Sequence, residues 1–582
     1  MVACRSNTMQ GVRQLKPDTL ASLLLAAWWV FNLLQAAFTG LADDEAYYWY
    51  FSRHLDWGYY DHPPMVALLV ALSSWLPGLL GIRFFATLLQ PLYLLLFWHL
   101  IRPADASRRD ALLYVLLCFS QPLLQLYGFM AVPDAPLMMF TVMFFWAYRR
   151  FYRDNSFVSA LLLGMSVALL GYSKYHGVLV VGLVLLANPK LFLRGRLYVA
   201  GGVALLLFFP HLWWQYEHDW ASFRYHLVGR NAWGYDLSFT LEYLATVAVI
   251  FNPLWIVHFI KGLCKPASDE DLTLRRIFIV LFAGFVLFFL VATMRGRVQP
   301  QWLLPVSMPV VAMVFRAGRR SRFVHTAAII CVVLFTVVRV VAVINPTHLR
   351  GQLWEGDEPY RKLAAVADGR PVEFLGCYSF AAKYAFYTGQ PTHCSSFYYS
   401  RENQWQYDTL DRTFAGREVV VADLGDLHGE SLEVEANRNI KYMVVTDFHP
   451  MRELKITCME PIDFCFPDSL PEFPLTIRVT NPYSYDIVST EDNPVCISLW
   501  FQWGTNTVAA ATAPLSDTLH ARSERVVRPV MTMSSSVPEG THLSGLAIGY
   551  AAFYPAANSP QYRTSVTRTS GTTTVKGDWK LK

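Results

Sequence analysis

Two short segments near the start of the chain place carboxylates next to a histidine. They are residues 43–49 (DDEAYYW) and 58–64 (GYYDHPP), and both follow an apolar run at 20–38. A carboxylate can take the proton from an attacking hydroxyl group, so Asp44 and Glu45 are candidate catalytic bases. The apolar run is long enough to cross a bilayer, and ionisable groups at a membrane are costly unless they have a function.

A reaction that releases an anionic leaving group also needs cations, and several lie in other loops. Lys174 lies within 171–177 (GYSKYHG), between two apolar runs, and Asp134 precedes another such run. Arg295 and Arg297 share one short loop. We therefore expect a substrate site on one membrane face, with these candidate contacts: Tyr59, Tyr60, Asp61, His62, Asp134, Lys174, Arg295 and Arg297.

Each candidate also has a simpler interpretation. Asp44, Glu45 and Asp134 are of the residue types that cap helix N-termini. Lys174 is a candidate for reaching lipid headgroups along its own alkyl chain, and the arginines for binding lipid phosphates non-specifically. The tyrosines suit an interfacial aromatic belt as well as a sugar-stacking surface. Only the gathering of acids and bases on one face favours a functional site.

The composition predicts a membrane protein. Of 582 residues, 54% are hydrophobic and only 16% are charged, against about 25% charged in soluble domains. Lys and Arg occur in short clusters between apolar runs and form no continuous basic stripe. The formal net charge of +5 therefore gives no indication of nucleic-acid binding.

The apolar runs predict eleven membrane-spanning helices. They lie near 20–38, 83–101, 111–127, 135–151, 157–173, 175–188, 197–213, 241–260, 277–293, 302–315 and 324–344. Basic clusters such as 108–109, 149–153 and 319–322 alternate with loops that carry few basic residues. The positive-inside rule then places the N-terminus in the cytoplasm and everything after residue 345 outside. The first run is longer than the apolar core of a cleaved signal peptide, so we expect an uncleaved anchor.

The composition changes after residue 345. Strand patterns at 372–376 and 418–423, with a helical pattern at 381–387 between them, predict a small α/β domain over 346–452. Apolar runs at 475–479, 495–501 and 543–548, separated by turn residues, predict a β-sandwich over 453–582. The Thr-rich segment 564–574 suits either a last strand or a loose tail.

Five of the nine cysteines fall in this outer region. An oxidising compartment would permit disulfides between Cys377 and Cys394 or between Cys458 and Cys465. The odd number, and the absence of CxxC spacing, leave these pairings open and make metal binding by cysteine improbable.

The segments 43–49 and 55–64 (LDWGYYDHPP) carry a resemblance to a known family, together with 133–137 (PDAPL), 173–175 (SKY) and 218–223 (HDWASF). They resemble bacterial members of the protein-mannosyltransferase-like superfamily, glycosyltransferase family 39. These are multi-span membrane proteins of the GT-C architecture, and their relatives include the transferase that adds aminoarabinose to lipid A. The resemblance covers about residues 20–345, and it sets the expected core at 1–345.

The resemblance implies a glycosyltransferase in the bacterial cytoplasmic membrane that uses a polyprenyl-phosphate-linked sugar on the outer face, with inversion. The family's acidic pair falls on Asp44 and Glu45, which makes Asp44 the general base. A family lysine that follows an acidic residue falls on His62, and neutral imidazole lacks the fixed charge of that lysine. No cofactor is certain; a divalent metal ion is a candidate, with Asp61 and His226 as its ligands. The acceptor and the role of the sandwich stay open.

The main alternative is a transporter or flippase for an amphipathic anion, whose intramembrane charges would line a pathway. Transporters of this kind are commonly built from repeats with Gly- or Pro-broken spans in matching halves. This chain instead gathers its ionisable residues at one face and continues into a large outer region. A non-catalytic scaffold for the sandwich would not need the acids and bases of the first segments. The sequence therefore favours the enzyme.

Overall fold

The structure is a computed structural model that divides into two compact units, Met1–Glu355 and Gly356–Lys582. Each unit is described by itself. The structure describes residues 15–229, 235–264, 269–346, 348, 351–396, 402–425, 427, 429–435, 438–459, 462–467, 472–503, 506–534, 542–553, 563–569 and 572–578.

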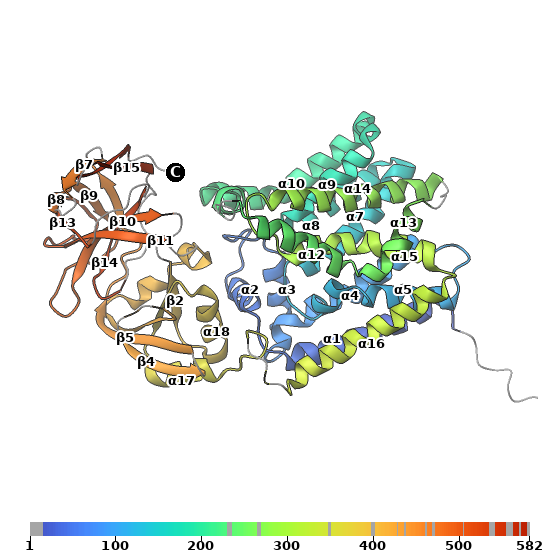
Figure 1. Cartoon of the computed structure of the whole chain (residues 1–582), viewed down its shortest axis with the longest axis horizontal. Helices are drawn as coiled ribbons and strands as arrows, with labels where there is room; N and C mark the ends of the chain where they lie inside the picture. Colours follow the sequence, from blue (N-terminus) through green and yellow to red (C-terminus); the bar gives the residue numbers. More distant parts are fainter. Residues whose placement is uncertain are drawn as a thin grey trace, which may run out of the picture. The chain divides into compact units, whose positions relative to one another are not determined.

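The first unit is helical (Figure 1). Its first half contains α1 (Pro17–Phe38), α2 (Asp43–Arg53), α3 (Met65–Ser73), α4 (Leu80–Ile101), α5 (Arg108–Phe119), α6 (Pro122–Leu126), α7 (Asp134–Asp154), α8 (Phe157–Ser173) and α9 (His176–Ala187). Its second half contains η1 (Pro189–Leu193), α10 (Gly195–Glu217), α11 (Ala221–Arg224), η2 (Tyr225–Gly229), α12 (Leu237–Ile250), η3 (Pro253–Trp255), α13 (Ile256–Cys264), α14 (Asp269–Ala292), η4 (Pro300–Val306), α15 (Ser307–Gly318) and α16 (Arg322–Ile344).

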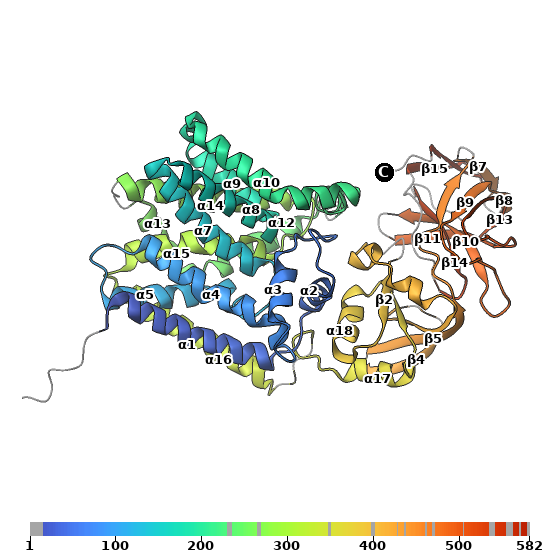
Figure 2. The same cartoon turned by 180° about the vertical axis from the view of Figure 1, so that it is seen from behind.

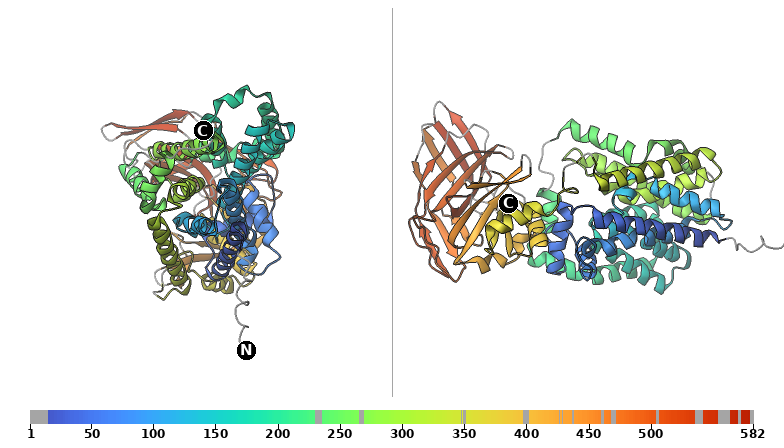
Figure 3. Two further views of the ribbon diagram at one scale, coloured as in Figure 1. Left: turned by 90° about the vertical axis from the view of Figure 1, so that its right-hand side faces the viewer. Right: turned by 90° about the horizontal axis from the view of Figure 1, so that it is seen from below.

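Most of the long helices of this unit run roughly along one direction (Figure 3). Five are long and apolar enough to cross a membrane: Pro17–Phe38, Leu80–Ile101, Gly195–Glu217, Leu272–Ala292 and Arg322–Ile344. The pair Leu237–Ile250 and Pro253–Cys264, bent by 65°, counts as a sixth if it forms one broken span. The other predicted spans are helical but shorter, interrupted or more polar. The chain is thus a multi-pass membrane protein, and the count of eleven stays a prediction.

The first predicted loop is itself helical. α2 and α3 lie at one end of the unit, beside the end of α1, and α1 and α16 lie side by side (Figures 1 and 2). α2 begins with three acidic residues, which its N-terminal dipole favours. The segment that carries the candidate base is therefore a short, fixed helix.

The second unit begins with an α/β part. Its helices are α17 (Glu358–Ala367) and α18 (Tyr378–Thr388), with short turns η5 (Gln404–Tyr407) and η6 (Leu410–Phe414). Its sheet has the order β2-β1-β3-β5-β4. The strands are β1 (Val372–Leu375), β2 (Thr392–Ser395), β3 (Arg417–Asp423), β4 (Glu430–Glu435) and β5 (Arg438–Phe448). β1 is parallel to β2 and β3, and β5 is antiparallel to β3 and β4. The predicted strands and helix are confirmed.

The remaining strands form the predicted β-rich part. One sheet has the order β14-β10-β11-β13-β8, and two smaller sheets have the orders β12-β9-β6 and β15-β16-β7. The strands are β6 (Lys455–Cys458), β7 (Ile462–Pro467), β8 (Glu472–Pro474), β9 (Ile477–Asn481), β10 (Val495–Trp503), β11 (Asn506–Pro514), β12 (Ser523–Val527), β13 (Val530–Met533), β14 (His542–Tyr550), β15 (Arg563–Thr569) and β16 (Thr572–Asp578). The Thr-rich segment is thus a hairpin of two strands.

One hydrophobic core joins the two parts of the second unit. It contains Val419 and Val445 from the α/β sheet together with Ile497 and Leu546 from the sandwich. The boundary proposed at 452/453 therefore separates two kinds of sheet that pack as one compact unit.

The cysteines of this unit are thiols where the structure describes them. Cys377, Cys394 and Cys458 are all free, so the Cys377–Cys394 disulfide is not formed. The Cys377 thiol instead contacts the Leu375 carbonyl oxygen at 3.1 Å. The side chain of Cys465, the predicted partner of Cys458, lies outside the described residues.

Candidate active site

The two adjacent acids at the start of α2 have different surroundings. Asp44 is exposed, whereas Glu45 has 0% exposure. The Glu45 carboxylate accepts hydrogen bonds from Arg83 Nε at 2.8 Å and Arg83 Nη2 at 2.5 Å. It also accepts from the backbone N–H groups of Ala131 at 2.7 Å and Ala42 at 3.2 Å. Glu45 is thus saturated and caps the helix, as the simpler interpretation predicted, while Asp44 can face a substrate.

Arg83 is a positioning residue that was not among the candidates predicted from the sequence. It is fully buried, and besides Glu45 it donates to the carbonyl oxygens of Ala36, Thr39 and Gly40, each at 2.7 Å. These carbonyl groups lie at the end of α1 and just after it. Carbonyl oxygens at a helix end have no N–H partner within the helix, and Arg83 supplies one. A charge at the start of an apolar run was the available signal, because such a charge needs a buried partner.

Asp134 and Lys174 form a second buried ion pair. Lys174 Nζ donates to both Asp134 carboxylate oxygens, at 2.8 and 2.7 Å, and the two residues are 2% and 5% exposed. The pair joins the first turn of α7 to the residue after α8. Lys174 does not extend toward the lipid headgroups, and much of its charge is already neutralised.

Hydrogen bonds and ring contacts bring these loops together. The Glu45 carboxylate accepts from the backbone N–H group of Ala131, in the loop that leads to Asp134. The ring centroid of Tyr175, the neighbour of Lys174, lies 5.1 Å from that of His226, whose Nε2 donates to the Asp61 backbone oxygen. Both predicted segments and the loops that carry Asp134 and Lys174 therefore belong to one region at the end of the helical unit.

The segment from α10 to η2 holds the second predicted motif in place. His211 Nδ1 donates to the Trp57 carbonyl oxygen at 2.7 Å, and Ser222 Oγ donates to that of Tyr59 at 2.7 Å. Gly58 is required at this contact, because a Cβ there would lie 2.5 Å from the Trp214 ring. Within this segment, only residues 218–223 and His226 were singled out from the sequence, so His211, Trp214 and their contacts with the motif were not predicted.

The tyrosines of that motif serve the fold. Tyr59 is 1% exposed, stacks on Phe51 with centroids 4.2 Å apart, and donates its hydroxyl to the Phe51 and His54 carbonyl oxygens, at 3.1 Å each. Tyr60 is also buried, with its ring 5.2 Å from that of Tyr225. Trp57, in the same loop, is exposed and is therefore better placed than these tyrosines to stack on a bound molecule.

The remaining candidates differ in exposure and pairing. His62 is half-buried, with its ring 5.4 Å from that of Tyr48 and 6.2 Å from that of His226. Arg297 pairs with Glu242 of α12 at 2.9 Å, and both are exposed. Arg295 is exposed, and no described carboxylate lies within ion-pair distance of it. Of the predicted cations, Arg295 is thus the one best able to receive an anion.

The predicted metal ligands contact each other through the backbone. His226 Nε2 donates to the backbone oxygen of Asp61 at 2.8 Å, which leaves Nδ1 as the ring nitrogen with a lone pair. A metal ion held by Asp61 and His226 stays a prediction. Searched over the described residues, the one group of His, Cys, Asp or Glu side chains with metal-binding spacing is His393, Asp408 and Asp411 in the second unit.

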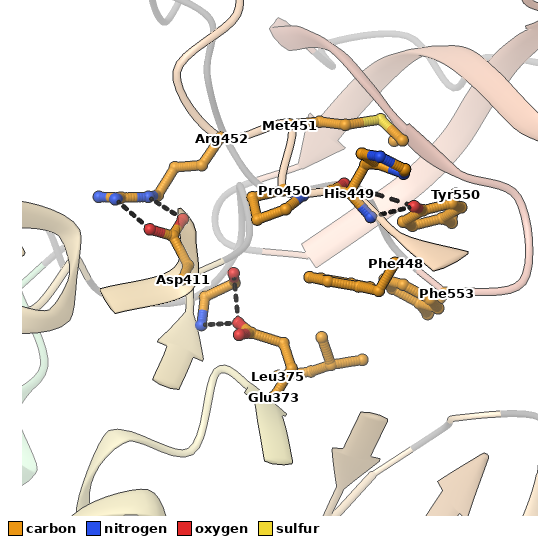
Figure 4. A pocket seen from close by; sticks show the side chains of 12 residues that line it. Glu373, Leu375, Asp411, Phe448, His449, Pro450, Met451, Arg452, Tyr550 and Phe553 are labelled. Atoms are coloured by element: carbon orange, nitrogen blue, oxygen red, sulfur yellow. Dashed lines mark hydrogen bonds and ion pairs between the residues drawn. The ribbon is translucent and has the colours of Figure 1, made fainter. Parts of the chain in front are cut away.

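That group is better described as an ion network. His393 Nδ1 donates to Glu373 at 2.9 Å, and its Nε2 donates to the Trp405 carbonyl oxygen at 3.1 Å, so both nitrogens carry protons. Asp411 accepts from Arg452, as Figure 4 shows. Burial alone would lower the pKa of His393, but the Glu373 carboxylate raises it above its usual value. Burial raises the pKa of Asp408 to about 7.

Comparison with known proteins defines the class. Residues 61–214 match the family model of dolichyl-phosphate-mannose-protein mannosyltransferases. The structure resembles the crystal structure of ArnT from Cupriavidus metallidurans in the apo state, with TM-score 0.54 and 11% identity over 72% of this chain and 97% of that one. The structure of the same enzyme bound to undecaprenyl phosphate gives TM-score 0.50 and 14% identity over the same shares. The chain thus has the GT-C membrane fold.

A protein of known activity is also similar in sequence. The lipid A galacturonosyltransferase RgtD of Rhizobium johnstonii is 27% identical over 255 residues, which cover 40% of this chain and 53% of the relative. The match therefore spans about half the length of that protein. The chain is related to the GT-C glycosyltransferases of the protein-mannosyltransferase-like group, as the motifs predicted.

Proposed function

We propose that the protein transfers a sugar from a polyprenyl-phosphate-linked donor to an acceptor at the outer face of the bacterial inner membrane. The observation that carries the proposal is the division of roles between two adjacent acids. Glu45 is buried and neutralised by Arg83, while Asp44 is exposed one residue earlier. The similarity to glycosyltransferases supports the reaction class.

In this mechanism the acceptor hydroxyl attacks the anomeric carbon from the face opposite the phosphate. The bond from that carbon to the phosphate oxygen breaks as the new glycosidic bond forms, which inverts the configuration. The acceptor proton passes to the Asp44 carboxylate. The Glu45–Arg83 pair keeps α2 in place, so that the base keeps its position during the reaction.

The leaving polyprenyl phosphate gains negative charge and needs a fixed cation. Lys174 is less suited to this than its sequence position indicates, because Asp134 already neutralises it. We assign the phosphate contact to Arg295, with Lys174 and Asp134 as positioning residues. His62 and Asp61 then contact the sugar or the phosphate.

The test uses the donor that accumulates in cells lacking this protein. Lipid-linked sugars extracted from those cells are supplied to the purified full-length chain, and loss of donor and release of polyprenyl phosphate are followed. Turnover that fails when Asp44 is replaced by Asn supports the proposal. Movement of intact donor across vesicles without sugar release would instead indicate the transporter.

The orientation is tested separately by reporter fusions. Fusions after Arg109, Arg153 and Arg322 are expected to report the cytoplasm, whereas fusions after Gly58 and Asp447 report the outside. A cytoplasmic signal after Asp447 would require an even number of spans and would contradict an outer location of the second unit.

A further inference from the structure

A buried arginine in α16 has no carboxylate to neutralise it. Arg339 is 6% exposed and donates to the side-chain oxygens of Asn32 at 2.8 Å and Gln125 at 3.0 Å, and also to Gln35. Its guanidinium carbon lies 4.6 Å from the Phe31 ring centroid and 5.1 Å from that of Phe129. Across the described residues, no acidic side chain lies within ion-pair distance of it.

This arrangement differs from the other buried cations of the helical unit. Arg83 and Lys174 each meet a carboxylate, so their charges are balanced. Amide oxygens and aromatic faces solvate the charge of Arg339 without cancelling it. Its hydrogen bonds to Asn32, Gln35 and Gln125 use three of the five N–H donors of a guanidinium. A buried charge between membrane helices is costly unless it has a function, and an anion would balance this one.

A cavity lies directly beside the guanidinium. It has a volume of about 260 Å³ and is lined by Arg339, Gln35, Gln125 and Thr39 together with apolar side chains. Thr39 lies in the wall of this cavity, and its buried hydroxyl has no hydrogen-bond partner among the described residues. An unsatisfied buried hydroxyl is costly, and a ligand acceptor that the side chain turns to meet would recover this cost. The cavity therefore adjoins both the unbalanced charge of Arg339 and an unsatisfied hydroxyl.

The cavity is reached from the lipid side of the helical unit. Leu126 and Val338 line it and are 43% and 55% exposed on the surface of this unit. Arg339 lies five residues before the end of α16, which places it roughly 7 Å below the helix end. A helix end at the membrane surface would place Arg339 near the boundary between headgroups and hydrocarbon. The volume holds several groups of water size, at about 30 Å³ each, enough for a phosphodiester and the first carbons of its chains.

We propose that this cavity binds the phosphate group of an anionic phospholipid of the bilayer. The phosphate oxygens accept from the free N–H groups of Arg339 and from the Thr39 hydroxyl, and the acyl chains run along Phe335 and Val338. The site is separate from the proposed transfer chemistry and does not depend on it. It is linked to α2 through the backbone, because the Thr39 carbonyl oxygen accepts from Arg83.

The experiment uses native mass spectrometry of the purified, delipidated full-length chain, titrated with phosphatidylglycerol or phosphatidylcholine. We expect the wild-type chain to retain phosphatidylglycerol about tenfold more tightly than phosphatidylcholine. Arg339→Met removes this preference, and Arg339→Lys keeps part of it because the charge survives without the fork. Thr39→Val weakens retention roughly fivefold, the size of one hydrogen bond.

Arg322→Met is the matched control, because Arg322 is an exposed arginine in the first turn of the same helix. Its retention of phosphatidylglycerol is expected to equal that of the wild type. If Arg339→Met does not fold, Thr39→Val and Arg339→Lys still decide the matter. Unchanged retention and preference in those two variants would overturn the proposal. Displacement of phosphatidylglycerol by undecaprenyl phosphate at an equal or lower concentration would overturn the choice of lipid.

Discussion

Buried charges are arranged differently in the two units. In the helical unit Glu45 pairs with Arg83 and Asp134 with Lys174, each pair joining elements far apart in the chain, while Arg339 is held by amide oxygens. In the second unit His393, Glu373, Asp411 and Arg452 lie in one network with Asp408 at its edge. Separate pairs hold helix ends in place, whereas a shared network can exchange protons without losing all of its contacts.

The difference follows from the surroundings. A charge between membrane helices has no water to solvate it, so a cation paired with a carboxylate there cannot lose its partner cheaply. The second unit is a mixture of sheet, turn and loop, where backbone carbonyls such as that of Trp405 also accept from charged groups. Fixed pairs suit a site that must keep its geometry, and the network suits a region that responds to pH.

The largest effect is expected when one member of a pair is removed. Lys174→Ala leaves Asp134 buried without its cation, and we expect a loss of about 3 to 5 kcal/mol in stability. Thermal unfolding of the purified chain measures it. The double variant Lys174→Met with Asp134→Leu is expected to recover most of the loss. If Lys174→Ala is stable but binds the donor poorly, Lys174 contacts the phosphate after all.

Asp44→Asn is expected to lower turnover by about 10² or more while the fold stays intact, because an amide cannot accept the acceptor proton. Initial rates with the lipid-linked donor measure the loss. Glu45→Gln, at the neighbouring residue, is the control. It is expected to lower stability before it lowers turnover, because it weakens the pair with Arg83. Near-normal turnover in folded Asp44→Asn would move the base to Glu45, Asp61 or Asp134.

The second unit is expected to lose stability as the pH rises from about 4 to beyond 7. Burial raises the pKa of Asp408 from 3.8 to about 7, so between these values the folded chain keeps a proton that the unfolded chain has lost. His393 acts in the same direction. Its pKa is raised in the folded chain, so protonated His393 stabilises the fold below that pKa, and the contribution is lost above it.

Hydrogen exchange of β1 and β2 in the full-length chain measures the change, of order 2 kcal/mol after allowance for partial exposure. Asp408→Asn removes the titrating carboxyl and is expected to flatten the profile. A profile that stays steep in this variant would assign the effect to His393, and a flat wild-type profile would contradict the network.

The smallest effect is expected at the exposed arginines. Arg295→Gln is expected to raise the KM for donor about tenfold and also to slow turnover, since a phosphate contact is lost. Arg297→Gln is the matched control two residues away, whose charge already faces Glu242. Equal, small effects of both changes would point to non-specific contact with lipid phosphates.

The sequence by itself determined the class of the molecule and the region of its site. Apolar runs fix which segments become helices, because only helices satisfy their own backbone groups in lipid. Alternating patterns likewise predicted β1, β3, β10 and β14. The motifs at 43–49 and 58–64 pointed to one end of the helical unit because they follow an apolar run directly, and the structure places α2 at that end (Figure 1). These are local properties, read within one segment at a time.

Only the tertiary structure decided what each charged residue does. Asp44 and Glu45 are neighbours of the same chemical type, yet Arg83, 38 residues away, buries one and leaves the other exposed. Lys174 looked like a free cation until Asp134 was found 2.7 Å from it. Arg339 lay unnoticed within an apolar run, and its amide partners come from α1 and the segment before α7. The net charge of a buried group and the molecules it can contact depend on residues that are distant in the sequence. Low-dielectric surroundings make each contact strong and each missing contact costly.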